Sequence, residues 1–220
     1  MTGIENRAAI FAALVSRGLE EIEIFCKRGR SRRFEVGVTG KAGISSVEGG
    51  WAIRAGTSRS SLFVAGTGSP DAKSVWPEPD GQPLRLPAAI TVPDWRPPAD
   101  LDSALVGESE AMALLAGIES ALASEIPDGR LLRGVLEEGT SETTIDSNRD
   151  IAVSYRSRAA SLVVEAVGPW PGSASVVLSL AARDHRDFHP PAIASRLANR
   201  LVLSRGGTDV ARERGDVLLS

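Results

Sequence analysis

Several residue types that would mark a particular class of protein are scarce in this sequence. Among 220 residues there is one cysteine, Cys26, so the chain can form no internal disulfide. A lone cysteine suits a reducing compartment, which predicts a cytoplasmic protein. No apolar run approaches the roughly 18 residues of a membrane span, so no membrane association is expected. The formal net charge of −3 argues against a chain-wide nucleic-acid surface.

The common catalytic and nucleotide-binding motifs are also missing. The patterns G-x-x-x-x-G-K-[ST], G-x-G-x-x-G and G-x-S-x-G do not occur, and Gly66-Thr67-Gly68-Ser69 lacks the rest of either phosphate-binding pattern. Glu20-Glu21 and Glu137-Glu138 are adjacent in strand-like sequence, where successive side chains point to opposite faces. Neither pair is therefore expected to act as a carboxylate dyad.

His185 and His189 are the only histidines. Their spacing is that of the zinc-binding helix H-E-x-x-H, but Arg186 stands where that motif has the glutamate that activates metal-bound water. Pro190-Pro191 also makes a continuing helix unfavourable. We predict a polar loop leading into the last helix; a hydrolase centred on these two histidines is the alternative. The sequence thus predicts no catalytic, cofactor-binding or metal-ligating residue.

Cys26 belongs to an alternating run in which it shares one strand face with Ile22 and Ile24. This pattern predicts a small buried apolar side chain and not a nucleophile.

Five cations follow within seven residues: Lys27, Arg28, Arg30, Arg32 and Arg33. The turn-like stretch 28–31 lies between two alternating runs, which predicts a hairpin with the cluster at its solvated tip. The alternative is binding of phosphate or an acidic partner. No aromatic residue interleaves the cluster to stack on bases, so nucleic acid is not expected as a partner.

Hydrophobic periodicity predicts three helices and two blocks of short strands. The helices are expected at 4–17 (with Ile4, Ala8, Phe11 and Val15 at helical spacing), from Ser103 to before Pro127, and at 191–203. The strands are expected at 20–27, 33–38, 43–48, 50–56 and 60–65, and at 130–138, 142–147, 150–156, 158–167 and 173–182. Short polar turns between such strands favour antiparallel pairing. We therefore predict an α+β fold, a two-layer arrangement of antiparallel sheet with helices packed on it.

A proline-rich stretch separates the two blocks. Eight of the 13 prolines fall between Pro70 and Pro98, so this stretch is expected to be a loop or linker, fixed to the body by Trp76 and Trp95. The predicted organisation is 1–66 as the first half of an α+β domain, 67–105 as the loop or linker, 106–215 as the second half, and 216–220 as the truncated start of a further domain.

The order of these features resembles the N-terminal region of the TldD/PmbA (TldD/TldE) family over most of the chain outside 67–105. The resemblance is carried by five stretches, namely Gly18–Ile24 followed by an R-x-F-E-V strand, Gly43–Glu48, Gly49–Arg54, Thr144–Arg156 and Gly215–Ser220. In this sequence Asn148-Arg149-Asp150 replaces the glycine-containing turn of the family.

The resemblance implies a relation to zinc metallopeptidases that cut unstructured peptides and work as TldD–TldE-type pairs. Their H-E-x-x-x-H motif belongs to a C-terminal domain and is absent from these 220 residues. Zinc is therefore expected only in a family catalytic domain or partner. We expect a non-catalytic N-terminal-type domain that shapes a substrate passage or binds a TldD/TldE-type partner subunit, a homo-oligomer being the other assembly. A stand-alone module that binds protein or extended peptide is the alternative function.

Overall fold

The computed structural model describes residues 7–68, 70–72, 76–87, 101, 103–172 and 174–205. The first four elements are α1 (Arg7–Ser16), β1 (Glu21–Gly37), β2 (Gly40–Gly56) and β3 (Ser61–Thr67). They are followed by α2 (Glu108–Glu125), β4 (Arg130–Ser147), β5 (Ala152–Val167), β6 (Val176–Ala182), a 3₁₀ turn (His185–Asp187) and α3 (Pro190–Ser204). No helix in these ranges has both the length and the apolar character required to cross a membrane.

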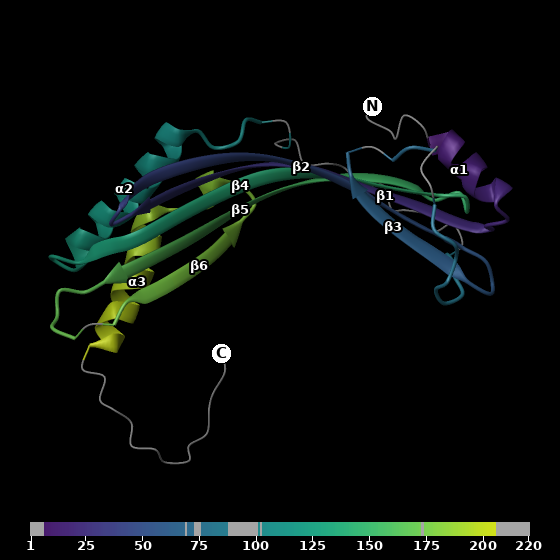
Figure 1. The fold of residues 1–220 in the computed structure, drawn as a ribbon. Helices are drawn as coiled ribbons and strands as arrows, with labels where there is room; N and C mark the ends of the chain where they lie inside the picture. Colours follow the sequence, from purple (N-terminus) through teal and green to yellow (C-terminus); the bar gives the residue numbers. More distant parts are fainter. Residues whose placement is uncertain are drawn as a thin grey trace, which may run out of the picture. The chain divides into compact units, whose positions relative to one another are not determined.

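The six strands form one sheet in the order β3-β2-β1-β4-β5-β6 (Figure 1). β2 and β3 pair antiparallel, with Gly50 opposite Thr67. β1 and β4 also run antiparallel, because Arg30 contacts Thr140 whereas Glu35, farther along β1, contacts Arg133. The predicted α+β fold, antiparallel sheet with helices packed on it, is confirmed.

The element order repeats once. The series α1-β1-β2-β3 is followed by α2-β4-β5-β6, and β1 and β4 meet at the centre of the sheet. β1 ends at Gly37 and β4 at Ser147, 110 positions later; β2 ends at Gly56 and β5 at Val167, 111 positions later. Even the left-handed residue after the first helix recurs, as Gly18 (φ 82°) and Asp128 (φ 63°). We call α1–β3 the first repeat and α2–β6 the second repeat.

The strands β1, β2, β4 and β5 are each about twice as long as the strands predicted there. The expected hairpin turn at 28–31 is wrong, because β1 continues through it to Gly37 and the turn lies at residues 38–39. Likewise, 43–48 and 50–56 are one strand, as are 130–138 and 142–147, and β5 replaces the strands expected at 150–156 and 158–167. Gly29 pairs next to Thr140 of β4. A strand with neighbours on both sides keeps its hydrogen bonds through a glycine or an arginine run, and short-range sequence signals do not report this.

The turn between β4 and β5 explains the departure at Asn148-Arg149-Asp150. Asp150 has φ 60°, and aspartate is among the few residues that adopt this left-handed conformation readily. It therefore supplies the backbone geometry for which a glycine was expected.

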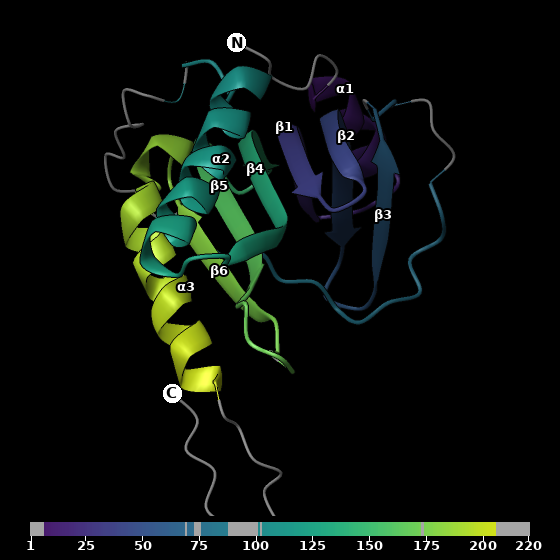
Figure 2. The ribbon, with the colours of Figure 1, turned by 90° about the vertical axis from the view of Figure 1, so that its left-hand side faces the viewer.

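In the first repeat α1 packs against one end of the strands (Figure 2). Ile10 and Leu14 of α1 join Ile22, Ile24 and Ile53 in a buried apolar cluster. The helical face predicted from Ala8 and Val15 is wrong, since both are exposed.

The loop after β3 completes this cluster. Trp76 is 7% exposed and packs edge-on against Trp51, with ring centroids 6.3 Å apart. Arg17, just after α1, donates to the carbonyl oxygens of Trp76 (3.0 Å) and Pro77 (3.2 Å). The prediction that Trp76 fixes the loop is confirmed, and residues 70–72 and 76–87 form no helix or strand. Trp95, the start of the first helix before Arg7 and the strand at 216–220 lie outside the described residues.

The strands of the second repeat are covered by α2 together with α3, the helix that follows this repeat. The predicted stripe of α2, Ala111, Leu115, Ile118 and Leu122, is buried, as are Ile193, Leu197 and Leu201 of α3. The two helices pack against each other and α3 contacts β6 (Figure 2). α3 begins with prolines, which suit the first helical turn because its N–H groups have no partner within the helix.

The contacts of the chain group it into two compact units, neither of which is continuous in sequence. One comprises residues 1–33, 43–106 and 137–160, and the other comprises 34–42, 107–136 and 161–220. Each long strand therefore contributes to both units. The division into 1–66, 67–105 and 106–215 stays a prediction.

Candidate functional site

One face of β1 changes character halfway along the strand. Ile22 and Ile24 are fully buried beneath α1, and the side chains two residues apart that continue this face are Arg28, Arg30 and Arg32. The three arginines are exposed. An apolar face covered by a helix thus gives way to a row of guanidinium groups.

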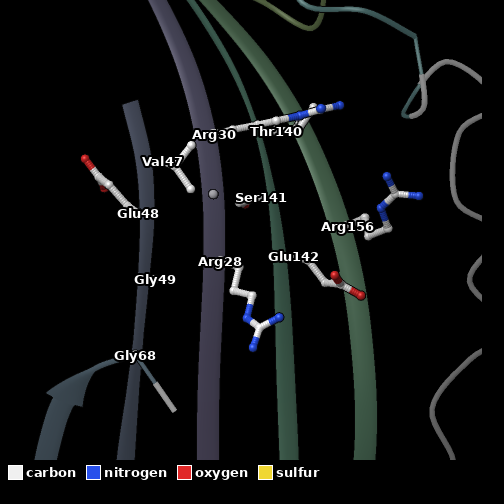
Figure 3. Close-up of a pocket in the computed structure, with 11 residues that line it drawn as sticks. Arg28, Arg30, Val47, Glu48, Gly49, Gly68, Thr140, Ser141, Glu142 and Arg156 are labelled. Carbon is white, nitrogen blue, oxygen red and sulfur yellow. Dashed lines mark hydrogen bonds between the residues drawn. The ribbon is translucent and has the colours of Figure 1, made fainter. Parts of the chain in front are cut away.

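A groove of about 500 Å³ lies over this part of the sheet (Figure 3). Its lining comes from β1, β2, β4 and β5, and from Gly68 directly after β3. Five charged residues line it, namely Arg28, Arg30, Arg156, Glu48 and Glu142, and the Glu48 side chain points away from the others (Figure 3). The whole groove belongs to the first compact unit.

The charged groups of the groove differ in how they are held. Arg30 donates from Nε to the hydroxyl of Thr140 at 3.3 Å, and Glu48 accepts from the hydroxyl of Ser46 at 3.3 Å. Glu142 and Arg156 are engaged in further interactions. Within the described ranges Arg28 makes no hydrogen bond or ion pair. Arg28 is thus the cation most available to a ligand.

Glycine keeps part of the groove open. A Cβ atom on Gly49 would lie 3.8 Å from Cγ of Arg28, an ordinary contact distance with no clash. A larger side chain there would therefore occupy groove volume without forcing the backbone to move.

A buried ion pair borders this region. Arg158 and Glu138 are both fully buried, and Arg158 donates to Oε1 of Glu138 from Nε (3.2 Å) and Nη2 (3.0 Å). Arg158 also donates to the carbonyl oxygens of Ser103 (3.1 Å) and Ala104 (3.0 Å), and Oε2 of Glu138 accepts from the amide of Val106 at 2.6 Å. Because both carboxylate oxygens are bonded, the pair fixes the extended segment 103–106. We see in it a structural clamp.

The groove has the chemistry of a binding site. Guanidinium groups donate hydrogen bonds to carboxylates and phosphates, and they stay charged at any physiological pH. The hydroxyls of Ser141 and Ser157 bond each other at 2.8 Å.

The structure does not bring the two histidines to one site. His185 is buried, with Nδ1 3.3 Å from Oδ1 of Asp184, whereas His189 is exposed at the start of α3. Arg186 donates to both oxygens of Asp184 at 2.7 Å. The predicted polar loop is a short 3₁₀ turn capped by Asp184. His185 and His189 therefore do not fit a shared zinc ion, and no step through zinc is derived for them.

Cys26 lies on the strand face that the sequence predicts, but it is half-buried and not buried. It packs against the apolar cluster of the first repeat. Burial raises the pKa of its thiol, an effect that Arg28 opposes and Asp146 reinforces. A thiol with a raised pKa stays protonated and is a poor nucleophile.

The basic cluster lies in the middle of a strand and not at a hairpin tip. The alternation of β1 divides it, with Arg28, Arg30 and Arg32 on one face and Lys27 and Arg33 on the other. The signal that could have found the groove is the spacing of the three arginines at every second residue, read together with the apolar residues that precede them.

Comparison with known proteins rests on structure. No protein-family model and no curated protein sequence matches the chain. Among solved structures, a candidate modulator of DNA gyrase from Thermotoga maritima matches with a TM-score of 0.73 and 12% identity, over 90% of this chain and 47% of that one. TldE from Thermococcus kodakarensis matches with a TM-score of 0.70 and 15% identity, over 88% of this chain and 47% of TldE.

A second candidate modulator of DNA gyrase, from Bacteroides thetaiotaomicron, matches with a TM-score of 0.67 and 14% identity, over 96% of this chain and 52% of that one. The chain shares the fold of these proteins. It spans about half the length of each. One of them is TldE, so the resemblance noted in the sequence is supported at the level of the fold.

Proposed function

We propose that this chain is a non-catalytic domain of a TldD/PmbA-like zinc metallopeptidase system in the cytoplasm, where it binds extended peptide and a catalytic partner subunit. The observation that carries the proposal is the fold shared with TldE over 88% of this chain and 47% of TldE. In such a system the zinc and the residues that cleave the peptide come from the partner. This chain provides a surface for the peptide.

The free edge of β2 supports a role in binding extended chains. β3 pairs only with Gly50–Gly56, so the outer edge of β2 from Gly40 to Gly49 has no neighbouring strand in the described sheet. Ile44 and Val47 on this edge are 60% and 88% exposed. Free edge strands are usually protected by charge or proline. On this edge charges stand only near the two ends, at Lys41 and Glu48, and residues 42–47 between them contain neither charge nor proline. An added strand can hydrogen-bond to such an edge.

The test is association with a family chain that carries H-E-x-x-x-H. We expect the two chains to co-purify and the rate of cleavage of an unstructured peptide to rise when both are present. Ile44→Lys should weaken association or rate because a charge on the edge opposes strand addition. Val202→Lys, which changes an exposed apolar residue of α3, is the matched control and should have no effect.

Two results would contradict this proposal. One is the absence of both association and any change in cleavage rate. The other is zinc bound by the isolated chain together with peptide turnover.

A stand-alone peptide-binding module is the second candidate function. It is favoured by one observation, that the groove is built wholly from one compact unit of this chain and needs no residue of a partner. Peptide binding by the isolated chain, without association with a catalytic family member, would select this candidate.

A further inference from the structure

We propose that the groove binds acidic side chains of an extended peptide, with Arg28 and Arg30 as the groups that receive the carboxylates. This inference rests on the proposed role in peptide binding and specifies the chemistry of the peptide. It concerns the sheet face of the groove, which is distinct from the free edge of β2.

The arrangement of arginines on β1 is the first argument. Arg28, Arg30 and Arg32 lie at alternate positions on one face of a strand that has neighbours on both sides. Arg32 donates to the carbonyl oxygen of Val106 at 3.3 Å and Arg30 donates to the hydroxyl of Thr140 at 3.3 Å. Arg28 makes no hydrogen bond or ion pair within the described ranges. Its guanidinium therefore keeps its donors for a bound carboxylate.

The second repeat contains an internal precedent. Glu138 is the counterpart of Arg28, 110 positions later, and Arg158 is the counterpart of Val47, 111 positions later. There a carboxylate meets a guanidinium, and an extended segment of the chain, 103–106, lies over them and bonds to both. In the first repeat the corresponding place is the open groove. The same strand geometry thus already holds an arginine, a carboxylate and extended backbone together.

Acidic peptide fits the groove better than nucleic acid does. Glu142 also lines the groove, and its carboxylate would repel a continuous phosphate backbone more than it would repel separate carboxylates. None of the described residues that line the groove is aromatic, so none of them stacks on a base. A volume of about 500 Å³ accommodates a few residues of peptide.

The test measures binding of fluorescent ten-residue peptides to the full isolated chain. The acidic peptide alternates glutamate and alanine and has blocked ends, so that only side-chain carboxylates can bind; glutamine and lysine versions serve as comparisons. We expect the acidic peptide to bind more tightly, and added salt to weaken it. Arg28→Gln and Arg30→Gln should each reduce its affinity about tenfold, the size expected for loss of a charge-assisted hydrogen bond.

Two further variants complete the design. Arg59→Gln removes an exposed arginine outside the groove and should leave binding unchanged. Gly49→Leu keeps every charge but fills the groove, and it should reduce binding of the acidic peptide while the circular dichroism spectrum stays that of the parent.

Several results would overturn the inference. They are equal affinity for the acidic and glutamine peptides, unchanged affinity in folded Arg28→Gln, or tighter binding of a single-stranded DNA oligonucleotide that depends on Arg28. Failure here is separable from failure of the proposed function. Association with a catalytic chain but no acidic preference refutes only the inference, whereas acidic binding without that association refutes the proposed function.

Discussion

The two repeats use the same series of elements to different ends. The first covers its strands with a helix of 10 residues and a loop that contributes Trp76, and the second uses α2, of 18 residues, together with α3. Strand lengths hardly differ, with 17, 17 and 7 residues in the first repeat against 18, 16 and 7 in the second. The strands of the two repeats are therefore alike, and the helices and loops that cover them decide which strand positions are buried.

Corresponding positions on the strands show the consequence. Glu138 and Arg158 are fully buried beneath segment 103–106, whereas their counterparts Arg28 and Val47 are exposed in the groove. A charged side chain stands in both places, namely Glu138 in the buried clamp and Arg28 in the groove that we propose binds a ligand. Position in a strand does not determine the role of a residue; the segment that lies over it does.

The largest expected effect is loss of the buried arginine. Arg158→Met should lower the free energy of unfolding by about 3–5 kcal/mol, because the Glu138 carboxylate is left buried without its partner. At the corresponding exposed position in the first repeat, Arg28→Met should change the free energy of unfolding by less than about 0.5 kcal/mol. Urea denaturation of both variants measures the contrast. Equal effects would show that the two places are not covered differently.

Removal of Trp76 should cost nearly as much. Trp76→Ala is expected to lower the free energy of unfolding by about 3–5 kcal/mol, because a large side chain leaves a cavity in the cluster of the first repeat. Leu197→Ala in α3 is the matched change in the second repeat, with an expected cost of about 2–5 kcal/mol. A Trp76→Ala variant as stable as the parent would mean that the loop does not complete the first core.

A glycine of the second repeat gives a smaller effect. Gly134 is the counterpart of Ile24, and a Cβ atom there would lie 2.8 Å from Cδ2 of Leu115. Gly134→Ala should therefore cost about 1–3 kcal/mol through overpacking. Gly49→Ala, where the nearest atom is 3.8 Å away, should be almost neutral. Thermal unfolding of the pair tests whether α2 requires this close approach; a neutral Gly134→Ala would refute it.

The smallest effect concerns the turns. The four-residue turn 148–151 reaches back to β1, whereas its two-residue counterpart 38–39 is short. Asn148 accepts from the amide of Ile22 at 2.9 Å and donates to the carbonyl oxygen of Glu20 at 2.7 Å, and Arg149 pairs with Glu21. The hydrogen bond from Arg149 lowers the pKa of Glu21.

Because the pKa of Glu21 is lower in the folded state than in the unfolded state, the ion pair stabilises the fold at pH values above the unfolded pKa of glutamate. This stabilisation is lost as the pH falls through the folded pKa of Glu21. The melting temperature of Glu21→Gln should therefore lie below that of the parent at pH 7, and the difference should shrink towards pH 3. A difference that grows on acidification would contradict the assignment. Glu78→Gln, in an exposed pair with Arg17, is the control.

Much of the fold follows from local sequence. The stripes of α2 and α3 and the alternation of Ile22 and Ile24 report on neighbours within a few residues, and the structure agrees with them. The prolines between Pro70 and Pro87 also agree, because the described residues of that stretch form no helix or strand. The groove could not be found in this way. Its lining comes from residues as far apart in sequence as Arg28 and Arg156. In addition, the glycine and arginines of residues 28–31 are typical of a turn in sequence, although they lie within a paired strand.

The sequence alone determined the class of fold and the strand face of Cys26, because side-chain periodicity is a local property. It also indicated where the helices lie, but α2 begins at Glu108 and not at the predicted Ser103, because residues 103–106 are extended over the Glu138–Arg158 pair. Only the tertiary structure decided that the strands run unbroken through 28–31, that the element order is repeated, and that three arginines face one groove. Those outcomes depend on which strands become neighbours, and one of the two neighbours of β1 is β4, where Thr140 contacts Arg30 from 110 residues away.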